Sequence, residues 1–221
     1  MDFTFNEDQL LFRESVRDFL VTEVIPEKIR ELWDTDSGRS DELWTQLTDM
    51  GLVGMTVPEE FGGLGMNEVD FVLLAQECGY VALPEPLVHT ALVAVPLLIE
   101  LGGELAAQWL PKIAAGEARV VVGLEQNHLV EDAHIADLIL LQRDGVLHAF
   151  TAAQVSLRHN ESIDPSRRLF AVRHGSVWRR TAVATTWPAR RYGSVSCSSS
   201  SVCSSGRWTT SSGRDRCSSK V

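Results

Sequence analysis

The chain of 221 residues lacks a long apolar run. Its longest one, residues 91–99, holds nine residues and includes Pro96, whereas a membrane-crossing helix needs roughly 18. The first eight residues show neither the basic stretch nor the apolar stretch of a secretory signal. These absences exclude a membrane-spanning protein and argue against secretion. We therefore expect a cytoplasmic protein with no membrane partner.

The last part of the chain lacks core-forming residues. Residues 173–221 contain no Leu, Ile, Met, Phe or Glu, but they hold 13 Ser and three of the four Cys. Their nine Lys and Arg against one Asp give +8, whereas residues 1–172 carry 11 basic against 29 acidic side chains, or −18. So little apolar surface cannot offset the entropy of ordering the segment. We predict a low-complexity, basic and disordered tail over residues 173–221.

Two origins for this tail remain open. In a GC-rich gene, Val and Leu codons read one base out of frame give Ser and Cys, so a frame shift between about residues 171 and 180 explains the composition. A natural disordered tail is the alternative. Cys197, Cys203 and Cys217 are irregularly spaced and indicate neither a zinc site nor a disulfide framework. Two adjacent Arg pairs without a repeated pattern do not predict nucleic-acid binding.

The first 115 residues show the periodicity of amphipathic helices. Asn6 and Ser40 stand where helix N-caps are expected, with Gln9 placed to complete a capping box at the first of them. Pro26 is expected to end or kink the first helix. The predicted helices cover about residues 7–24, 41–50, 67–79, 87–101 and 104–115.

One face of these helices is predicted to be buried. Phe12, Val16, Phe19 and Leu20 recur three and four residues apart and form an apolar stripe, as do the apolar residues of the later helices. The members of the core that we single out are Trp44, Phe71 and Trp109. The charged side chains expected to face water on the first helix are Arg13, Glu14, Arg17 and Asp18.

After Gly116 the pattern changes to that of strands. Residues 119–124 form a β-branched run, residues 138–142 and 146–150 flank an Arg-Asp-Gly turn, and residues 169–172 form another short run. We predict an α+β protein with three parts. An all-helical domain covers residues 1–117, a partial β-domain covers 118–172, and the tail follows.

Polar residues in the β-region suggest a metal site only weakly. The acidic and imidazole residues concerned are Glu125, His128, Glu131, Asp132 and His134. Their spacing matches no established ligand pattern, so we favour a solvated charge cluster and predict no metal. His89 lies in an apolar segment without a nucleophile or acid spaced around it, which favours an ordinary packed or surface imidazole.

Two motifs carry a resemblance to a known family. They are residues 58–65 (Pro-Glu-Glu-Phe-Gly-Gly-Leu-Gly), which follow residues 47–54, and residues 109–117 (Trp-Leu-Pro-Lys-Ile-Ala-Ala-Gly-Glu). In order and spacing they closely resemble the acyl-CoA dehydrogenase family over residues 3–117, and the resemblance continues weakly to residue 172. It implies a helical N-terminal domain, a middle β-domain and a C-terminal helical domain that builds a tetramer. It also implies that FAD takes a hydride from an acyl-CoA while a C-terminal Glu removes the α-proton.

The β-region departs from the family's flavin-binding pattern. Where the family has Leu-Thr-Glu-Pro and then Gly-Ser-Asp, this chain has Leu-Glu-Gln-Asn-His at residues 124–128, and only Leu124 clearly matches. Leu124 is therefore the one cofactor-binding residue that the resemblance implies. No Glu follows Glu161, so we assign no catalytic residue to this chain. Such departures resemble the degenerate subunits of heteromeric acyl-CoA dehydrogenases, in which unlike chains share the flavin.

Two functions remain open from the sequence. The first is a subunit of an FAD-dependent acyl-CoA dehydrogenase, which works as a homo- or hetero-tetramer and is incomplete in this chain alone. The second is a non-enzymatic helical module that binds partners or acyl chains.

Overall fold

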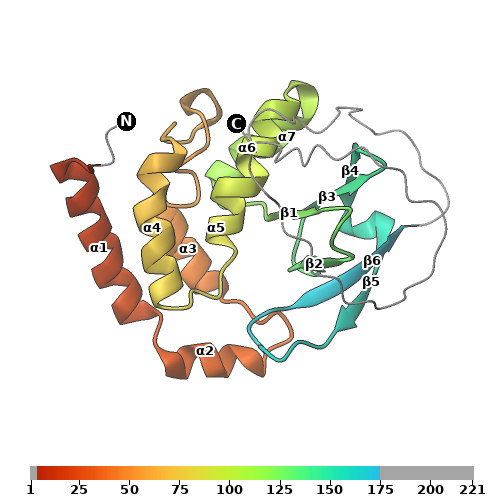
Figure 1. Ribbon diagram of the computed structural model, residues 1–221, viewed down its shortest axis with the longest axis horizontal. Helices are drawn as coiled ribbons and strands as arrows, with labels where there is room; N and C mark the ends of the chain where they lie inside the picture. Colours follow the sequence, from red (N-terminus) through yellow and green to blue (C-terminus); the bar gives the residue numbers. More distant parts are fainter. Residues whose placement is uncertain (1–3, 175–221) are drawn as a thin grey trace, which may run out of the picture. The chain divides into compact units, whose positions relative to one another are not determined.

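Helix α1 (Glu7–Glu23) begins at the capping box predicted for it. In the computed structural model, which describes residues 4–174 (Figure 1), Asn6 Oδ1 accepts the Gln9 backbone N–H at 2.7 Å, and Gln9 Oε1 accepts the Asn6 N–H at 2.9 Å. Helix α3 (Asp41–Asp49) is likewise capped by Ser40, as predicted. The predicted start of the tail at residue 173 is wrong, because Arg173 and His174 belong to a strand (Leu169–His174) that pairs with Val155–Asn160. The rest of the predicted tail, from residue 175 on, lies outside the described residues.

Pro26 does not simply end the helical region. It stands at the first position of a separate helix, α2 (Pro26–Trp33), which the sequence analysis did not predict. Proline suits this position because the first backbone N–H groups of a helix have no intrahelical acceptor. The chain therefore turns at Val24 and Ile25, and in Figure 1 α2 runs across the end of α1.

Helix α4 (Glu68–Tyr80) packs along α1. Their contact includes Glu77, which is 1% exposed and lies beside two arginines of α1. Arg17 Nη1 lies 3.3 Å from Glu77 Oε2, and Arg13 Nε lies 3.8 Å from Glu77 Oε1. The prediction that Arg13 and Arg17 face water is only partly correct, because their side chains are 29% and 43% exposed while a buried carboxylate on α4 attracts both guanidinium groups.

The predicted helix over residues 87–101 is continuous but not regular. It consists of α5 (Leu87–His89), a π-helical segment η2 (Thr90–Ala94) and α6 (Val95–Leu101). Pro96 has no N–H to donate to a carbonyl of the preceding turn, and a wider turn just before it accommodates the ring. Helix α7 (Gly103–Ala114) follows, with Pro111 inside it.

Within the described residues, six strands form two small sheets. Strand β1 (Val120–Gly123) pairs in parallel with β3 (Leu138–Arg143), which pairs antiparallel with β4 (Val146–Thr151). The second sheet has the order β2-β6-β5, with antiparallel pairs. Its strands are β2 (Leu129–Glu131), β5 (Val155–Asn160) and β6 (Leu169–His174).

Two apolar clusters hold these elements. The larger joins the helices to one face of the first sheet and contains Phe71 at 0%, Trp44 at 4% and Trp109 at 8% exposure, as predicted. The smaller lies between the sheets and includes Val121, Val130, Ile139 and Phe170. Alternate residues of β1 serve the two clusters, as the strand's two-residue period requires.

The α+β fold class predicted from the sequence is confirmed. The predicted hairpin is β3-β4, with Asp144 and Gly145 both at positive φ in its turn, whereas β2 and β5 were not predicted. The boundary between the predicted domains, after residue 117, stays a prediction. Among residues 4–174, no helix combines the length and apolar character that crossing a bilayer requires.

Candidate functional site

A buried ion pair joins the connection between α2 and α3 to the β-region. The guanidinium of Arg39 contacts both carboxylate oxygens of Asp132, with Nη2 2.5 Å from Oδ1 and Nε 3.3 Å from Oδ2. Both side chains are at most 5% exposed. Arg39 Nη1 donates to the backbone carbonyls of Gly38 and Ser166 at 2.8 and 2.9 Å. The hydrogen-bonding capacity of Arg39 is therefore nearly filled.

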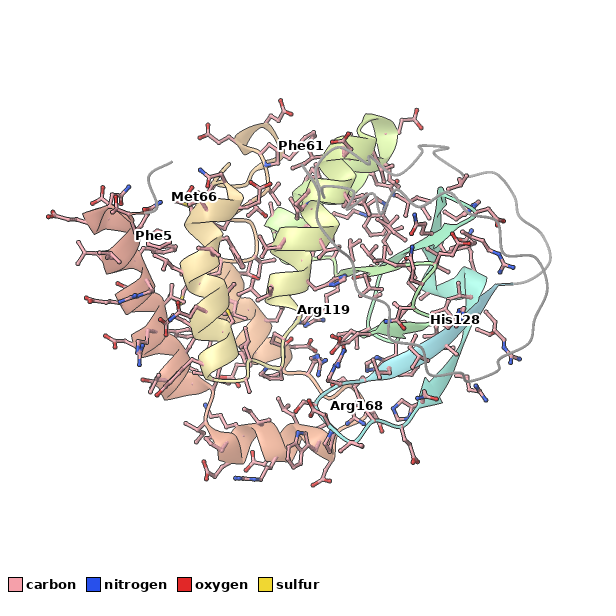
Figure 2. All side chains as sticks on the ribbon, in the orientation of Figure 1. Phe5, Phe61, Met66, Arg119, His128 and Arg168 are labelled. Atoms are coloured by element: carbon pink, nitrogen blue, oxygen red, sulfur yellow. The ribbon has the colours of Figure 1, made fainter. Side chains whose placement is uncertain are left out.

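The loop before β6 approaches the same connection. Arg168 Nη2 donates to the carbonyls of Trp33 and Thr35 at 2.7 and 2.8 Å, and Trp33 Nε1 donates to Ser166 Oγ at 2.7 Å. Figure 2 shows Arg168 next to the end of α2. These contacts shield Arg39 from solvent. They enclose one side of the junction, by which we mean the contact between the α2–α3 connection and the β-region.

Glu85 lies on the other side of the junction and is 4% exposed. Its Oε1 accepts the backbone N–H of Ser40 at 2.7 Å, while its buried Oε2 has no hydrogen-bond partner. Burial raises the pKa of Glu85 to about 7, although the hydrogen bond from Ser40 and the charges of Arg119 and Arg39 oppose the rise. A carboxyl group near neutrality with an unused acceptor is typical of functional sites.

His89 connects the helical region to β1. Its Nε2 accepts the backbone N–H of Val122 at 3.1 Å, so the neutral ring carries its proton on Nδ1. Burial lowers the pKa of His89 from its usual value, and the charge of Glu131 opposes this shift. The packed imidazole expected from the sequence is confirmed, and it supports the edge of β1.

A cavity of about 390 Å³ opens among these groups. Its lining includes Cys78 from α4, Glu85 from the segment after α4 and Val121 from β1. The paired Arg39 and Asp132 also line it. Burial raises the pKa of the Cys78 thiol to about 12, so this cysteine is held as an unreactive thiol.

Leu124, the residue implied to bind a cofactor, follows β1 directly and is 39% exposed. It borders a second cavity of about 410 Å³, together with Asn127, His128 and Arg143. This cavity shares no lining residue with the one at Glu85. A Cβ at Gly123 would lie 2.6 Å from Val130 Cγ2 and 2.7 Å from Leu141 Cδ2, so a larger residue here would have to displace these two methyl groups.

The predicted solvated cluster is correct for Glu125 and His128, which are exposed, but wrong for Asp132. Asp132 is buried with Arg39. His134 is half-buried, stacks on Phe170 with ring centroids 4.6 Å apart, and lies 2.8 Å from the Ser37 carbonyl through Nε2. The fifth member, Glu131, binds Arg167 at 3.2 Å. Within residues 4–174 no three His, Cys, Asp or Glu side chains are grouped to hold a metal ion.

The sequence analysis missed Arg39 and Glu85. The only sequence signal at Glu85 is its position between Pro84 and Pro86, which predicts an extended segment but not burial. Arg39 precedes the predicted cap Ser40, and nothing around it indicates an ion pair. Both residues acquire their environment from segments distant in the sequence.

Comparison with known proteins identifies relatives of the helical region. Residues 6–117 match the family described as acyl-CoA dehydrogenase, N-terminal domain. Over 164 residues the chain is 30% identical to the acyl-CoA dehydrogenase IpdE2 of Mycobacterium tuberculosis, a match that covers 74% of this chain and 50% of that protein. It is 32% identical over 116 residues to the mitochondrial long-chain specific acyl-CoA dehydrogenase of Rattus norvegicus, covering 51% and 26%. The chain thus spans half or less of the length of these two curated relatives.

Solved structures of low sequence identity share the fold. A chain of the ChsE4-ChsE5 complex from Mycobacterium tuberculosis superposes with a TM-score of 0.69 and 20% identity, covering 84% of this chain and 59% of that chain. A glutaryl-CoA dehydrogenase from Mycobacterium smegmatis in complex with FADH2 gives a TM-score of 0.57 with 15% identity, covering 76% and 52%. At these identities the similarity shows the fold.

Proposed function

Because this chain belongs to the acyl-CoA dehydrogenase family, we propose that it is a subunit of an FAD-dependent enzyme that introduces a double bond between the α- and β-carbons of an acyl-CoA thioester. It acts in this proposal as the incomplete chain of a hetero-oligomer. The catalytic carboxylate and most of the flavin contacts come in this proposal from a C-terminal domain or from a partner chain. The acyl-CoA substrate and the tetrameric assembly follow from the family and belong to the same proposal.

The loop after β1 is the observation that carries the proposal. Leu124 offers an exposed apolar side chain, and the polar groups of Asn127 are engaged within the loop itself. The Asn127 N–H donates to the Leu124 carbonyl at 3.0 Å, and Asn127 Oδ1 accepts the Leu129 N–H at 3.1 Å. No hydroxyl side chain occurs in residues 124–128. These residues do not form a complete flavin site, although Leu124 can still contact a flavin held by another chain.

Glu85 is not placed to act as the base of this reaction. Removing an α-proton from a thioester needs a positioned base and polarisation of the carbonyl oxygen. Glu85, a described carboxyl group with a pKa near neutrality, already has one oxygen committed to the Ser40 N–H. It does not border the cavity at Leu124.

A relation to two-component enzymes is consistent with a flavin site that this chain forms only in part. The structural neighbours include the ChsE4-ChsE5 complex and the Tcur3481-Tcur3483 steroid acyl-CoA dehydrogenase, whose names each join two components. By analogy, the partner of this chain is a second acyl-CoA dehydrogenase chain with an intact flavin segment.

Flavin content tests the proposal directly. We expect the 221-residue chain purified alone to show no stoichiometric flavin absorbance and no reduction of an electron acceptor with acyl-CoAs. Co-expression with a complete acyl-CoA dehydrogenase chain that binds it should give a yellow complex with turnover. Flavin and turnover in the chain alone would contradict the incomplete-site proposal. A complex whose turnover equals that of the partner alone would favour the non-enzymatic binding module.

A matched pair of variants examines the role of Leu124. Leu124→Asp places a charge at the proposed flavin contact and should lower the flavin content of the complex. Ile163→Asp, at a fully exposed apolar residue between β5 and β6, should leave it unchanged. Equal flavin content in both complexes would exclude Leu124 from the contact.

A further inference from the structure

We propose that His134 is an acid-sensitive latch that holds a strap on the β-region, where the strap is defined as α2 and its connection to α3 (residues 26–40). The latch is closed while the ring of His134 is neutral, and protonation of the ring opens it. This device goes beyond the proposed function, because it involves neither a flavin nor an acyl-CoA.

The strap is held on the β-region mainly by polar contacts. All side chains of α2 are at least partly exposed, so apolar packing contributes less to its position than it does in α1, α3 or α4. Arg168 binds the strap at the carbonyls of Trp33 and Thr35. Two positions further on, the Ser37 carbonyl lies 2.8 Å from Nε2 of His134. Of these contacts, the one at Ser37 depends on an imidazole, which titrates near neutral pH, whereas a guanidinium stays charged.

The contacts of His134 define its protonation state. A carbonyl oxygen only accepts hydrogen bonds, so Nε2 carries the proton that is donated to Ser37. Nδ1 of the neutral ring is therefore unprotonated, and this nitrogen is buried without a hydrogen-bond partner among the described residues. A second proton has to enter at Nδ1, which is closed off from water and from the acceptors of residues 4–174.

The charged groups that face this imidazole are already paired or are themselves cations. Both oxygens of Asp132 accept from Arg39. Arg39 and Arg168 place two guanidinium groups near the ring. On its other side the ring stacks on Phe170 with centroids 4.6 Å apart, and the ring of His159 lies against Phe170 at 5.2 Å. A protonated ring would therefore be a buried imidazolium near two guanidinium groups, with one N–H that lacks an acceptor in the described part of the chain.

Protonation is expected to expel the ring from this position. Burial lowers the pKa of His134 from its usual value of 6.5, and the charges of Arg39 and Arg168 act in the same direction. The hydrogen bond with Ser37 and the charge of Asp132 oppose the shift without reversing it. The contact is therefore fully present above pH 6.5 and is lost as the pH falls through the lower pKa of the folded state. The expelled ring is hydrated, but it leaves the Ser37 carbonyl without its donor.

Ring-nitrogen chemical shifts of the full chain test the latch without a substitution. At about pH 7.5 we expect the His134 ring to be the tautomer with its proton on Nε2, and we expect it to take up a second proton only below pH 6.5. In the urea-unfolded chain the same ring should titrate near pH 6.5. A proton on Nδ1 in the neutral folded chain, or a folded midpoint at or above the unfolded one, would overturn the proposal.

Hydrogen exchange of two backbone amides measures the release of the strap. The Gly38 N–H donates to Thr35 Oγ1 at 3.0 Å, and Thr35 does not titrate. The Ile135 N–H donates to the backbone carbonyl of Asp132 at 3.1 Å, so its acceptor does not titrate either. After correction for the intrinsic rate, protection of both amides should fall about tenfold between about pH 7.5 and about pH 5, because the charged ring can no longer occupy its position. Unchanged protection would contradict the latch.

His134→Gln tests whether this ring is responsible. The amide of glutamine can donate to the Ser37 carbonyl but does not titrate, so the fall in protection should disappear. His159→Gln removes the other imidazole at Phe170 and should keep the fall. A fall that persists in His134→Gln would assign the effect to another group, such as Asp132, whose pKa is raised by burial, and would overturn the proposal.

A fall that is lost in His159→Gln would likewise overturn the proposal, because it would place the titrating ring on β5. None of these measurements involves flavin or turnover, so they are independent of the outcome for the proposed function.

Discussion

Nε2 of His89 accepts the backbone N–H of Val122 across 3.1 Å. In the first sheet, β1 pairs with β3 along one edge only, so the opposite edge needs acceptors from elsewhere. A side chain from the helical region thus completes the hydrogen bonding of the strand that leads to Leu124. The protonation state of this ring therefore affects one of the contacts that join the two regions.

Acid is expected to loosen this contact. The unfolded state of His89 takes up a proton near pH 6.5, whereas the folded state does so only at lower pH because burial lowers the pKa. The stability that His89 contributes is therefore fully present above pH 6.5, the pKa of the unfolded state. It is lost as the pH falls from there through the lower pKa of the folded state. Hydrogen exchange of the Val122 amide, corrected for its intrinsic pH dependence, should lose about five- to tenfold of its protection, or roughly 1 kcal/mol.

His89→Gln serves as the control for that experiment. The amide oxygen of glutamine can accept the same N–H but does not titrate, so protection of Val122 should become independent of pH. The Glu85→Gln background removes the titration of Glu85, which lines the same cavity as His89. Equal pH dependence with histidine and with glutamine would show that His89 does not govern the contact.

Glu85 is expected to give the opposite dependence on pH. Its pKa rises from 4.5 to about 7 on folding, so the folded state holds the proton between these values while the unfolded state releases it. Stability falls as the pH rises from 4.5 to 7 and is level beyond. The fall should amount to at most about 3 kcal/mol and should disappear in Glu85→Gln. Urea denaturation at a series of pH values measures it, and parallel curves for the two proteins would contradict a raised pKa of the buried Glu85 carboxyl.

The Arg39–Asp132 pair should show strong coupling. Arg39→Met leaves a buried carboxylate without its partner and should destabilise the chain by roughly 3–5 kcal/mol. Asp132→Asn keeps a residue that tolerates the positive φ of 59° while it removes the charge. The double variant should be more stable than the sum of the single effects by about 2 kcal/mol in a denaturant double-mutant cycle. Additive effects would indicate that the pair contributes no interaction energy.

Ala82 should be replaceable by glycine with a gain in stability. It has φ 52° at the end of α4, where the Leu83 N–H reaches the Cys78 carbonyl at 2.9 Å, and this six-residue closure normally uses glycine. Ala82→Gly should stabilise the chain by roughly 0.5–1 kcal/mol. Ala106→Gly, inside α7, should destabilise it by a similar amount. Thermal unfolding of both variants measures the expected gain and the expected loss of stability.

The helices were predictable because their signals are local. The capping box of α1 needs only Asn6 and Gln9, three residues apart, and the buried face follows from spacings of three and four. Strand β5 escaped prediction because Arg158, His159 and Asn160 interrupt any alternating apolar pattern. It is a strand because β6 supplies its hydrogen bonds, which composition alone does not reveal.

The candidate site was less predictable than the fold. Aspartate is rarely buried unless it is paired, so the sequence around Asp132 favours a surface position. Its partner Arg39 is 93 positions away. The same limit applies to Glu85, whose burial depends on Ser40, 45 positions away. Pairs of this kind are set by tertiary packing and leave no short motif.

The separation between Arg39 and Asp132 also orders events during synthesis. The contacts within each helix are short in sequence, and those between α1 and α4 span about 60 positions, so the helical region can collapse before Asp132 is made. Arg39 must wait for 93 further residues, which takes roughly 5–20 s at the usual rate of elongation. During synthesis of the residues between 117 and 132, the guanidinium of Arg39 lies at the surface of the helical region without its carboxylate partner. Once Asp132 and then Ser166 are made, both can bind it.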